Sequence, residues 1–189
     1  MKYIAITGGI GSGKSYVCRL LERRGIRVYD CDANAKRLMA GDHDLQTRLQ
    51  ELVGDGVFSG HVLQKRVLAA FLLASETNKQ AVDDIIHPAV AADFMRSGCQ
   101  WLESAILFDS GFNRRVPFSF IVCVSAPEEV RVSRVMARDQ ISREKALEWI
   151  GRQWPQEKVE QQSDFVIVND GNEDLDRQVA LLLNKVKQI

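Results

Sequence analysis

Residues 3–15 of this 189-residue chain read YIAITGGIGSGKS, and this stretch decides the fold. Its first part, 3–7, is a short apolar run that predicts a buried strand. The second part, 8–15, matches G-x-x-x-x-G-K-[ST], the pattern of a phosphate-binding loop. Such a loop turns its backbone N–H groups toward phosphate oxygens, and the helix that follows aims its positive end at the same oxygens. Because a strand precedes the loop and a helical pattern follows it, the stretch predicts a nucleotide-binding α/β protein.

The phosphate loop, 8–15, gives its residues predicted tasks. Lys14 is expected to reach the β- and γ-phosphates of ATP, and the hydroxyl of Ser15 is expected to ligate Mg²⁺. ATP and Mg²⁺ are therefore the predicted cofactors. The residues predicted to bind the nucleotide in or beside the loop are Gly9, Gly11, Ser12, Gly13, Lys14, Ser15 and Tyr16.

The pattern beyond the loop predicts a parallel sheet flanked by helices, the P-loop nucleotide kinase fold, in a single domain over 1–189. After a helix that starts at Lys14, 26–29 reads as a second strand that ends at Asp30. About 33–100 is mostly helical, which predicts an inserted subdomain with a helix boundary at His87-Pro88. Further strands are predicted at 105–108, 120–124 and 165–168, with a helical segment at 127–149 and a helix at the C-terminus.

The composition is that of an ordinary globular protein, and it excludes some classes of function. Lys and Arg number 25, as do Asp and Glu, so the chain lacks the basic excess typical of nucleic-acid-binding proteins. No apolar run approaches the roughly 18 residues of a membrane span, and the N-terminal run is too short for a signal peptide. We therefore predict a cytoplasmic protein that binds neither nucleic acid nor membrane, with its four scattered cysteines as free thiols.

Three classes of P-loop protein compete for this sequence. A GTPase would need a D-x-x-G switch and an N-K-x-D base-reading motif, and neither occurs. A motor or remodelling ATPase is usually larger and oligomeric. A small-molecule kinase needs an acceptor site and an arginine-rich lid that keeps water away from ATP, and the sequence has candidates for both. A kinase is thus favoured, and a nucleotide-gated binding protein with no acceptor is the alternative from a different class.

The acceptor candidate is Asp30-Cys31-Asp32, at the end of the second predicted strand. Ligands bind at the carboxyl ends of strands in such sheets, so a carboxylate here is expected beside the phosphate loop. Asp32 is predicted to be the catalytic base that takes the proton of the attacking hydroxyl. The alternative role is a helix N-cap, which suits Asp30.

The lid candidate is an arginine-rich helical stretch, with the lid itself at about 138–160. Arginines at i, i+3 and i+7 share a helix face, which groups Arg131, Arg134 and Arg138. Because phosphoryl transfer needs cations around the phosphate oxygens, Arg138 is predicted to be catalytic, as is Lys14, and both Arg134 and Arg138 are predicted to bind the nucleotide. Arg131 and Arg143 are predicted to lie on a solvated helix face.

Asp109 is a second metal candidate, because it follows the predicted strand 105–108. An apolar strand that ends in Asp is typical of the Walker B pattern, in which the Asp holds the metal's coordination shell. The alternative is an ordinary strand end, since many strands end in Asp.

Several motifs, taken together, resemble one known family. They are Thr7–Ser15 as the phosphate loop, Asp30-Cys31-Asp32 as a D-x-D motif, Leu63–Arg66, His87-Pro88, Ile106–Asp109, Arg134 with Arg138-Asp139, Gln153, Ser163-Asp164 and Asn169-x-Gly171. In this combination and order they resemble the dephospho-coenzyme A kinases over essentially the whole chain. Among the departures, Tyr16 stands where Thr is usual, Asp109 replaces Glu, and Arg131 stands where Gln is usual. None of these departures is expected to touch the phosphate loop or Asp32.

The resemblance implies transfer of the ATP γ-phosphate to the ribose 3′-hydroxyl of dephospho-coenzyme A, the last step of coenzyme A synthesis. By the same resemblance, the helical insert receives the acceptor, with Asp32 as the base, Arg66 and His87 near the acceptor, and Asn169 near the nucleotide. The alternative acceptor is a nucleoside monophosphate. A monomer or weak homo-oligomer is expected.

Overall fold

The chain divides into two compact units in the computed structural model, which describes residues 2–189. One unit combines 2–29 with 99–189 and contains a five-stranded sheet. The other unit, 30–98, is mostly helical and contains one short hairpin. Along the sequence, a mostly helical segment thus separates the two stretches that form the sheet-containing unit.

The sheet has the strand order β2-β5-β1-β6-β7, and its registered pairs are parallel. The strands are β1 (Tyr3–Thr7), β2 (Val28–Asp30), β5 (Trp101–Glu103), β6 (Phe118–Ser125) and β7 (Phe165–Val168). The central strand β1 lies between β5 and β6. The strands β2 and β5 lie on one side of β1, and the later strands β6 and β7 lie on the other side. In α/β sheets this switch in direction opens a crevice at the carboxyl ends of the strands, which is where the phosphate loop begins.

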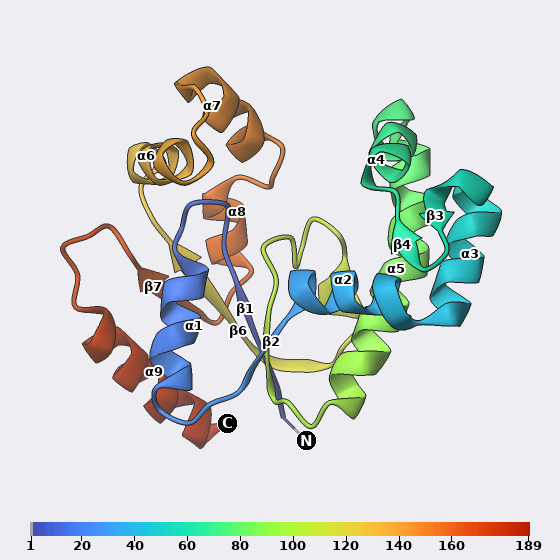
Figure 1. Ribbon diagram of the computed structural model, residues 1–189. Helices are drawn as coiled ribbons and strands as arrows, with labels where there is room; N and C mark the ends of the chain where they lie inside the picture. The colour runs from blue at the N-terminus through green and yellow to red at the C-terminus, as the bar shows by residue number, and fades with distance from the viewer. Residues whose placement is uncertain (1) are drawn as a thin grey trace. The chain divides into compact units, whose positions relative to one another are not determined.

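In the sheet-containing unit, some helices cover the sheet, and α6 and α7 form a separate pair (Figure 1). Those of this unit are α1 (Lys14–Glu22), η2 (Phe112–Arg114), α6 (Glu128–Asp139), α7 (Arg143–Gly151), α8 (Gln156–Gln161) and α9 (Leu175–Gln188). The helices α1 and α9 lie side by side, and their buried residues Leu21 and Leu182 pack with Ile6 of β1 in the main core. Burial of such apolar side chains is the main stabilisation of this layer.

The helices α6 and α7 have their own hydrophobic cluster, built on Val132, Val135, Ala146 and Ile150. Ile10 of the phosphate loop packs against this cluster. The turn between the two helices passes through Gln140, which has a left-handed backbone with φ 54° and ends α6. The predicted helical segment 127–149 is therefore two helices that share one apolar seam with the loop.

The unit 30–98 is built from helices with polar N-caps. Its elements are α2 (Cys31–Gly41), α3 (His43–Val53), η1 (Asp55–Val57), β3 (Phe58–Ser59), β4 (Val62–Leu63), α4 (Lys65–Ala74) and α5 (Glu76–Arg96). Side chains of Asp42 and Ser75 accept hydrogen bonds from the first turns of α3 and α5, as N-caps do. Phe94 and Leu49 are fully buried, so this unit has its own core.

Two predictions of secondary structure are wrong. The predicted strand 105–108 is a series of turns, and the strand lies earlier, at Trp101–Glu103. The apolar side chains of Leu107 and Phe108 are buried within these turns, so the apolar run reflects burial and not a strand. The predicted helix boundary at His87-Pro88 is absent because Pro88 lies inside α5. The proline removes one backbone hydrogen bond, but buried Val90 and Phe94 continue the helix on the core side.

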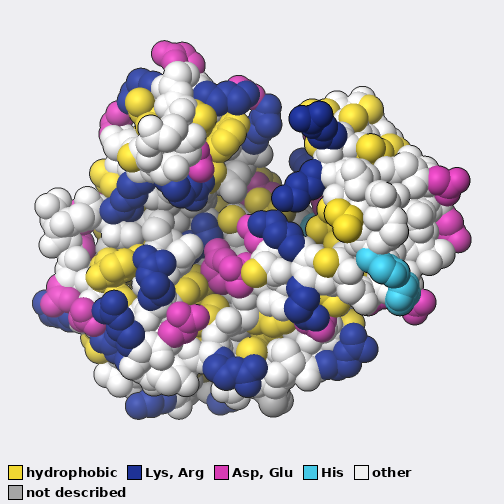
Figure 2. Space-filling view, in the orientation of Figure 1, with side chains coloured by type: hydrophobic (Ala, Val, Ile, Leu, Met, Phe, Trp, Pro, Cys, Tyr) yellow, Lys and Arg dark blue, Asp and Glu magenta, His cyan; other side chains and the backbone are white. Residues whose placement is uncertain are grey.

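Charged side chains of both signs are interspersed on the face of the molecule shown in Figure 2. This mixing agrees with the equal numbers of basic and acidic residues. Within residues 2–189, no helix combines the length and the apolar character needed to cross a membrane.

Candidate active site at the phosphate loop

The phosphate loop has the backbone geometry that its glycines predict. Gly13 has φ 91° and forms the N-cap of α1, so the helix begins at Lys14. A side chain at Gly13 would also place its Cβ 2.1 Å from the Nδ2 atom of Asn169. The loop is closed by a hydrogen bond from the Ser12 N–H to the Gly9 carbonyl, 3.1 Å. The N-terminal end of α1 is thus directed at the space that the loop encloses.

Glycine is also required at the loop tip, because α6 approaches the backbone closely. A Cβ on Gly9 would lie 2.3 Å from Nη2 of Arg131, and a Cβ on Gly11 would lie 2.6 Å from the Arg131 carbonyl oxygen. At Gly11 the neighbouring atom belongs to the backbone of α6, which cannot move aside, whereas at Gly9 it belongs to the Arg131 guanidinium. Gly9 and Gly11 therefore allow a helix far along the chain to pack directly on the loop.

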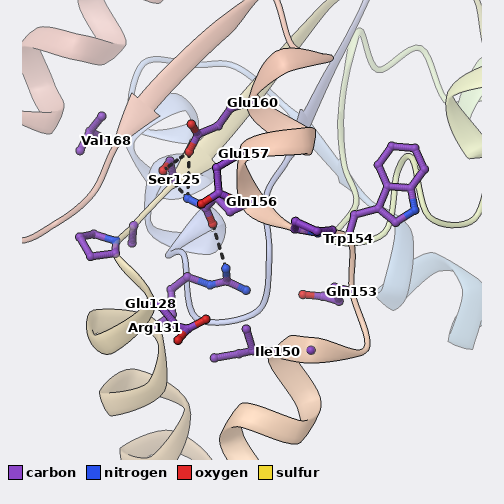
Figure 3. A pocket seen from close by; sticks show the side chains of 14 residues that line it. Ser125, Glu128, Arg131, Ile150, Gln153, Trp154, Gln156, Glu157, Glu160 and Val168 are labelled. Atoms are coloured by element: carbon purple, nitrogen blue, oxygen red, sulfur yellow. Dashed lines mark hydrogen bonds between the residues drawn. The ribbon is translucent and has the colours of Figure 1, made fainter.

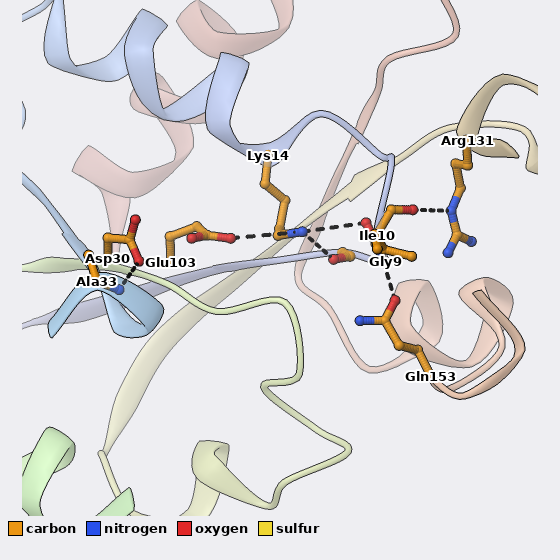
Figure 4. A network of polar contacts seen from close by, with 9 residues as sticks. Gly9, Ile10, Lys14, Asp30, Ala33, Glu103, Arg131 and Gln153 are labelled. Carbon is orange, nitrogen blue, oxygen red and sulfur yellow. Dashed lines mark hydrogen bonds and ion pairs between the residues drawn. The ribbon is translucent and has the colours of Figure 1, made fainter. Parts of the chain in front are cut away.

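Lys14 is buried, and its ammonium group lies under the loop (Figure 4). Its Nζ donates to the Gly8 carbonyl over 2.7 Å and lies 3.8 Å from Oε1 of Glu103. These contacts hold a positive charge at the loop, where a phosphate-binding lysine is expected. Beneath it, burial and, to a lesser degree, Glu160 raise the pKa of the Cys123 thiol to about 12, so this cysteine stays neutral.

Glu103 is an acidic residue of the site that sequence reasoning missed. It ends β5, next to the central strand, and pairs with Ile6 in the sheet register. Asp109 was predicted to occupy this strand end, because the apolar run 105–108 was interpreted as the strand. The signal that could have found it is the shorter apolar pair Trp101-Leu102 directly before the acid.

Arg134 and Asn169, both predicted to bind nucleotide, meet at the loop. The amide of Asn169 donates to the Ser12 carbonyl over 2.9 Å, and Nη1 of Arg134 lies 3.3 Å from the same oxygen. Nη2 of Arg134 donates to Oδ1 of Asn169 over 3.3 Å. Residues from the end of β7 and from α6 thus join on one carbonyl of the loop.

Other predicted nucleotide-site residues are exposed. Ser15 and Tyr16 lie at the exposed start of α1, and the guanidinium of Arg19 lies 5.6 Å from the Tyr16 ring centroid. Arg138 points to solvent and forms an ion pair with its neighbour Asp139, 2.7 Å.

The prediction that Arg131 is solvated is wrong, because only 4% of its surface is exposed. Its Nε donates to the Ile10 carbonyl over 2.9 Å, and Nη1 donates to Gln156 over 3.0 Å. Burial lowers the pKa of its guanidinium from the usual value. The helix spacing groups Arg131 correctly with its neighbours but does not show that this face packs on the loop. Arg143 is exposed as predicted, and it pairs with Glu129.

Asp109 contacts the segment that follows α7. Its Oδ1 accepts a hydrogen bond from the Trp154 N–H over 2.6 Å. The Trp154 ring stacks on Phe108 at 5.9 Å between centroids, and Nζ of Lys158 lies 3.4 Å from the Trp154 ring centroid. The strand on which the metal prediction rested is absent, and the observed contact ties two segments of the same unit together.

The acceptor candidates all lie in the unit 30–98. Asp30 is the N-cap of α2, and its Oδ1 accepts from the Ala33 N–H over 2.9 Å, which confirms the structural alternative for this residue. Asp32 lies in the first turn of the same helix and is exposed. Arg66 is exposed in the first turn of α4, and His87 lies within α5 with Nε2 3.5 Å from Oδ1 of Asp83.

Comparisons with known proteins agree with this fold and this loop. The family model described as CoaE, dephospho-CoA kinase, matches residues 2–174. The dephospho-CoA kinase of Bacteroides fragilis strain YCH46 is 42% identical over 191 residues, which cover 95% of this chain and 90% of the relative. That of Chlorobaculum tepidum is 36% identical, over 90% of this chain and 88% of the relative.

Solved structures give the same answer for the fold. A crystal structure from Thermus thermophilus has a TM-score of 0.79 and 34% identity, and it covers 98% of this chain and 97% of that chain. The dephospho-CoA kinase from Campylobacter jejuni has a TM-score of 0.67 at 19% identity, with 100% and 98% covered, and supports the fold alone. By the family model and by relatives matched over nearly its whole length, the chain belongs to the dephospho-CoA kinase family.

Proposed function

We propose that this dephospho-CoA kinase transfers the γ-phosphate of ATP to the ribose 3′-hydroxyl of its acceptor, with Asp32 as the base. The family's reaction is the final step of coenzyme A biosynthesis, and the enzyme class is EC 2.7.1.24. The observation that carries the proposal is the geometry of the phosphate loop. Lys14 is buried at the loop, and Arg134 and Asn169 both contact the carbonyl of its residue Ser12.

ATP binding rests on the loop and the residues around it. The backbone N–H groups of the loop and the helix N-terminus together form an anion site. Lys14 supplies the charge for the β- and γ-phosphates. Of the two arginines, Arg134 supports the loop directly, whereas Arg138 is exposed and free of the loop. We assign Arg138 to the transferring phosphate, because long exposed side chains can reorient when ATP binds.

Mg²⁺ fits the oxygen donors at the site. Among the described residues, no group of three or more His, Cys, Asp and Glu side chains forms a metal cage. Magnesium usually keeps several waters and takes only one or two protein oxygens beside the phosphates, so a cage is not required. The Ser15 hydroxyl and the Glu103 carboxylate are the protein oxygens that we assign to the ion, which would neutralise charge on the phosphates.

Asp32 is the acceptor-side base in this proposal. Its carboxylate is exposed in the first turn of α2, and its neighbour Asp30 is engaged in capping that helix. A carboxylate at such a position can take a hydroxyl proton while the new P–O bond forms. Arg66 and His87 are assigned to the acceptor in the same unit, where Arg66 offers an exposed cation for the acceptor's phosphates.

The experiment offers the purified enzyme ATP and Mg²⁺ with one acceptor at a time. The acceptors are dephospho-coenzyme A, AMP, CMP and UMP, and products are identified by mass spectrometry and ³¹P NMR. We expect a 3′-phosphate on dephospho-coenzyme A, and preferential phosphorylation of a nucleoside monophosphate would refute the acceptor. Size-exclusion chromatography with light scattering tests the expected monomer or weak homo-oligomer. A cytoplasmic location stays a prediction from sequence.

A further inference from the structure

We propose that Arg131 is a positioning residue that fixes the tip of the phosphate loop, at Ile10, against the α6–α7 pair and the segment after it. The inference rests on the proposed role of the loop in ATP binding. Three separate contacts converge on Ile10 from parts of the chain more than a hundred residues away.

The first contact is made by Arg131 on the carbonyl side of Ile10. Nε of Arg131 donates to the Ile10 oxygen over 2.9 Å (Figure 4). The bond is charge-assisted and partly buried, and charge-assisted bonds are roughly twice as strong as those between neutral groups. A charged donor that is 96% buried, as its 4% exposure implies, fixes this carbonyl more firmly than a solvated side chain could.

The second and third contacts hold the other sides of the same residue. The Ile10 N–H donates to Oε1 of Gln153 over 2.7 Å, from the segment that follows α7. The Ile10 side chain packs against the cluster of Val132, Val135, Ala146 and Ile150. The N–H donor, the carbonyl acceptor and the side chain of one loop residue are therefore all engaged by α6, α7 and the segment after α7.

Arg131 is itself held in place by a chain of polar groups (Figure 3). Nη1 donates to Oε1 of Gln156 over 3.0 Å, and the amide nitrogen of Gln156 contacts Ser125 and Glu160. Ser125 is the last residue of β6, so this chain of bonds ends on the sheet. The guanidinium is thus tied to a rigid strand, which is what a positioning residue needs.

The remaining amino group of Arg131, Nη2, fits against the loop because Gly9 has no side chain. Nη2 is buried and has no hydrogen-bond partner within the described residues, and it lies against the bare Cα of Gly9. An unsatisfied buried donor normally destabilises a fold. Its retention here is explained by the other two nitrogens, whose bonds to Ile10 and Gln156 fix the whole planar group in that place.

The consequence for ATP is specific. Ile10 directly precedes Gly11, at the start of the phosphate-binding stretch of backbone N–H groups that leads into α1. If Ile10 moves, these groups lose the preorganised geometry on which phosphate affinity depends. Loss of Arg131 should therefore weaken nucleotide binding, while binding of the acceptor should change little.

The test compares Arg131→Met with Arg143→Met in the full-length enzyme. Arg143 is a matched control, because it is an arginine of the same helix pair whose exposed ion pair with Glu129 does not touch the loop. For Arg131→Met we expect KM for ATP and Kd for ADP to rise about tenfold or more, since a charged hydrogen bond is lost. KM for dephospho-coenzyme A should stay within about twofold, and Arg143→Met should match the wild type in every constant.

A second measurement separates positioning from a general loss of structure. Amide hydrogen exchange of the loop, in the absence of nucleotide, should be faster in Arg131→Met than in Arg143→Met, while exchange in β1 and β6 is unchanged. Unchanged loop exchange would overturn the proposal. So would equal rises in both KM values, because these would indicate a merely structural role.

Two further variants keep the proposal testable if Arg131→Met fails to fold. Arg131→Gln retains a donor at that position, and Gln153→Ala removes the contact on the opposite side of Ile10. If both residues act through Ile10, the rise in KM for ATP in the double variant Arg131→Gln/Gln153→Ala should be smaller than the product of the two single rises. Independent, multiplicative effects would refute a shared point of action. Failure of the loop as the ATP site itself is a different result, because Lys14→Ala would then leave ATP turnover intact.

Discussion

Lys14, the first residue of α1, and Glu103, the last residue of β5, face each other at the phosphate loop, with Nζ 3.8 Å from Oε1. Both side chains are largely buried. The carboxylate therefore lowers the positive charge that Lys14 presents to phosphates in the free enzyme, and it is an oxygen donor at the place where a metal–nucleotide complex is expected.

Glu103→Gln should separate these two effects. Without Mg²⁺, we expect ATP to bind at least as tightly as to the wild type, because a negative charge beside the phosphates is removed. With Mg²⁺, we expect kcat to fall about tenfold or more, because the amide is a weaker metal donor. Titration calorimetry with and without Mg²⁺, together with steady-state kinetics, measures both. A variant with full kcat at low Mg²⁺ would show that Glu103 serves only to orient Lys14.

Lys14→Ala should abolish most turnover while the fold survives. The substitution removes the charge that reaches the β- and γ-phosphates, and a buried ion pair with Glu103 is lost with it. Because the Glu103 carboxylate loses this contact, a lower melting temperature is also expected. Kinetics and circular dichroism measure the two effects. Near-normal activity in a folded Lys14→Ala protein would refute the assignment of the loop as the site of the ATP phosphates.

Asp32→Asn tests the proposed base. The amide keeps the shape of the side chain but cannot take the hydroxyl proton, so we expect kcat to fall by about 10²-fold with ATP affinity largely kept. The low end of the usual range for a general base applies, because phosphoryl transfer has a loose transition state.

The control for Asp32 is its neighbour Asp30, which caps α2. Asp30→Ala should destabilise the protein by about 1 kcal/mol through loss of the cap, with kcat close to the wild-type value. Chemical denaturation and kinetics of both variants decide between them. If Asp30→Ala were inactive and Asp32→Asn active, the roles of the two carboxylates would be the reverse of those proposed.

The two lid arginines should differ in kinetic signature. Arg134 contacts the Ser12 carbonyl and Asn169, so Arg134→Ala should mainly raise KM for ATP. Arg138 is free of the loop, so Arg138→Ala should mainly lower kcat, as expected for a group that acts in the transition state. Arg152→Ala is the matched control, because this exposed arginine pairs with Glu148 on the surface of α7. A rise in acceptor KM alone would place Arg138 in the substrate site.

Asp109→Ala distinguishes a metal ligand from a structural contact. The bond from the Trp154 N–H to Asp109 predicts a melting temperature lower by about 2–4 °C, for a loss of roughly 1 kcal/mol. The Mg²⁺ dependence of the rate should be that of the wild type. Asp109→Asn, whose amide oxygen can still accept the bond, should restore most of the stability. An increased Mg²⁺ requirement in both variants would instead support the metal role.

Local patterns in the sequence were sufficient for the loop, for β1 and α1, and for β7. In each case the residues that define the element are adjacent, as in the run from Tyr3 to Thr7 followed by glycines. Arg134 was also predicted, from helix spacing and the need for cations, and Asn169 from a family resemblance; the structure brings the two together on Ser12.

The roles of Arg131 and Glu103 could not be read from local patterns. Arg131 lies 121 residues from Ile10, and only the packing of α6 on the loop shows that this face is buried. Glu103 was missed because burial in turns gave 105–108 the apolar character of a strand. Pro88 shows the same limit, since packing of α5 overrides the local preference of proline to end a helix.

Gly9 and Gly11 meet a packing requirement that is separate from phosphate binding. Both positions leave room for Arg131, with hypothetical Cβ distances of 2.3 Å and 2.6 Å to its side chain and backbone. Drift toward alanine would therefore disturb the docking of α6 even in a lineage that no longer used ATP. A homologue that had lost catalysis would be expected to keep both glycines for as long as it kept a large buried side chain at position 131, so intact loop glycines alone are weak evidence of activity in distant sequences.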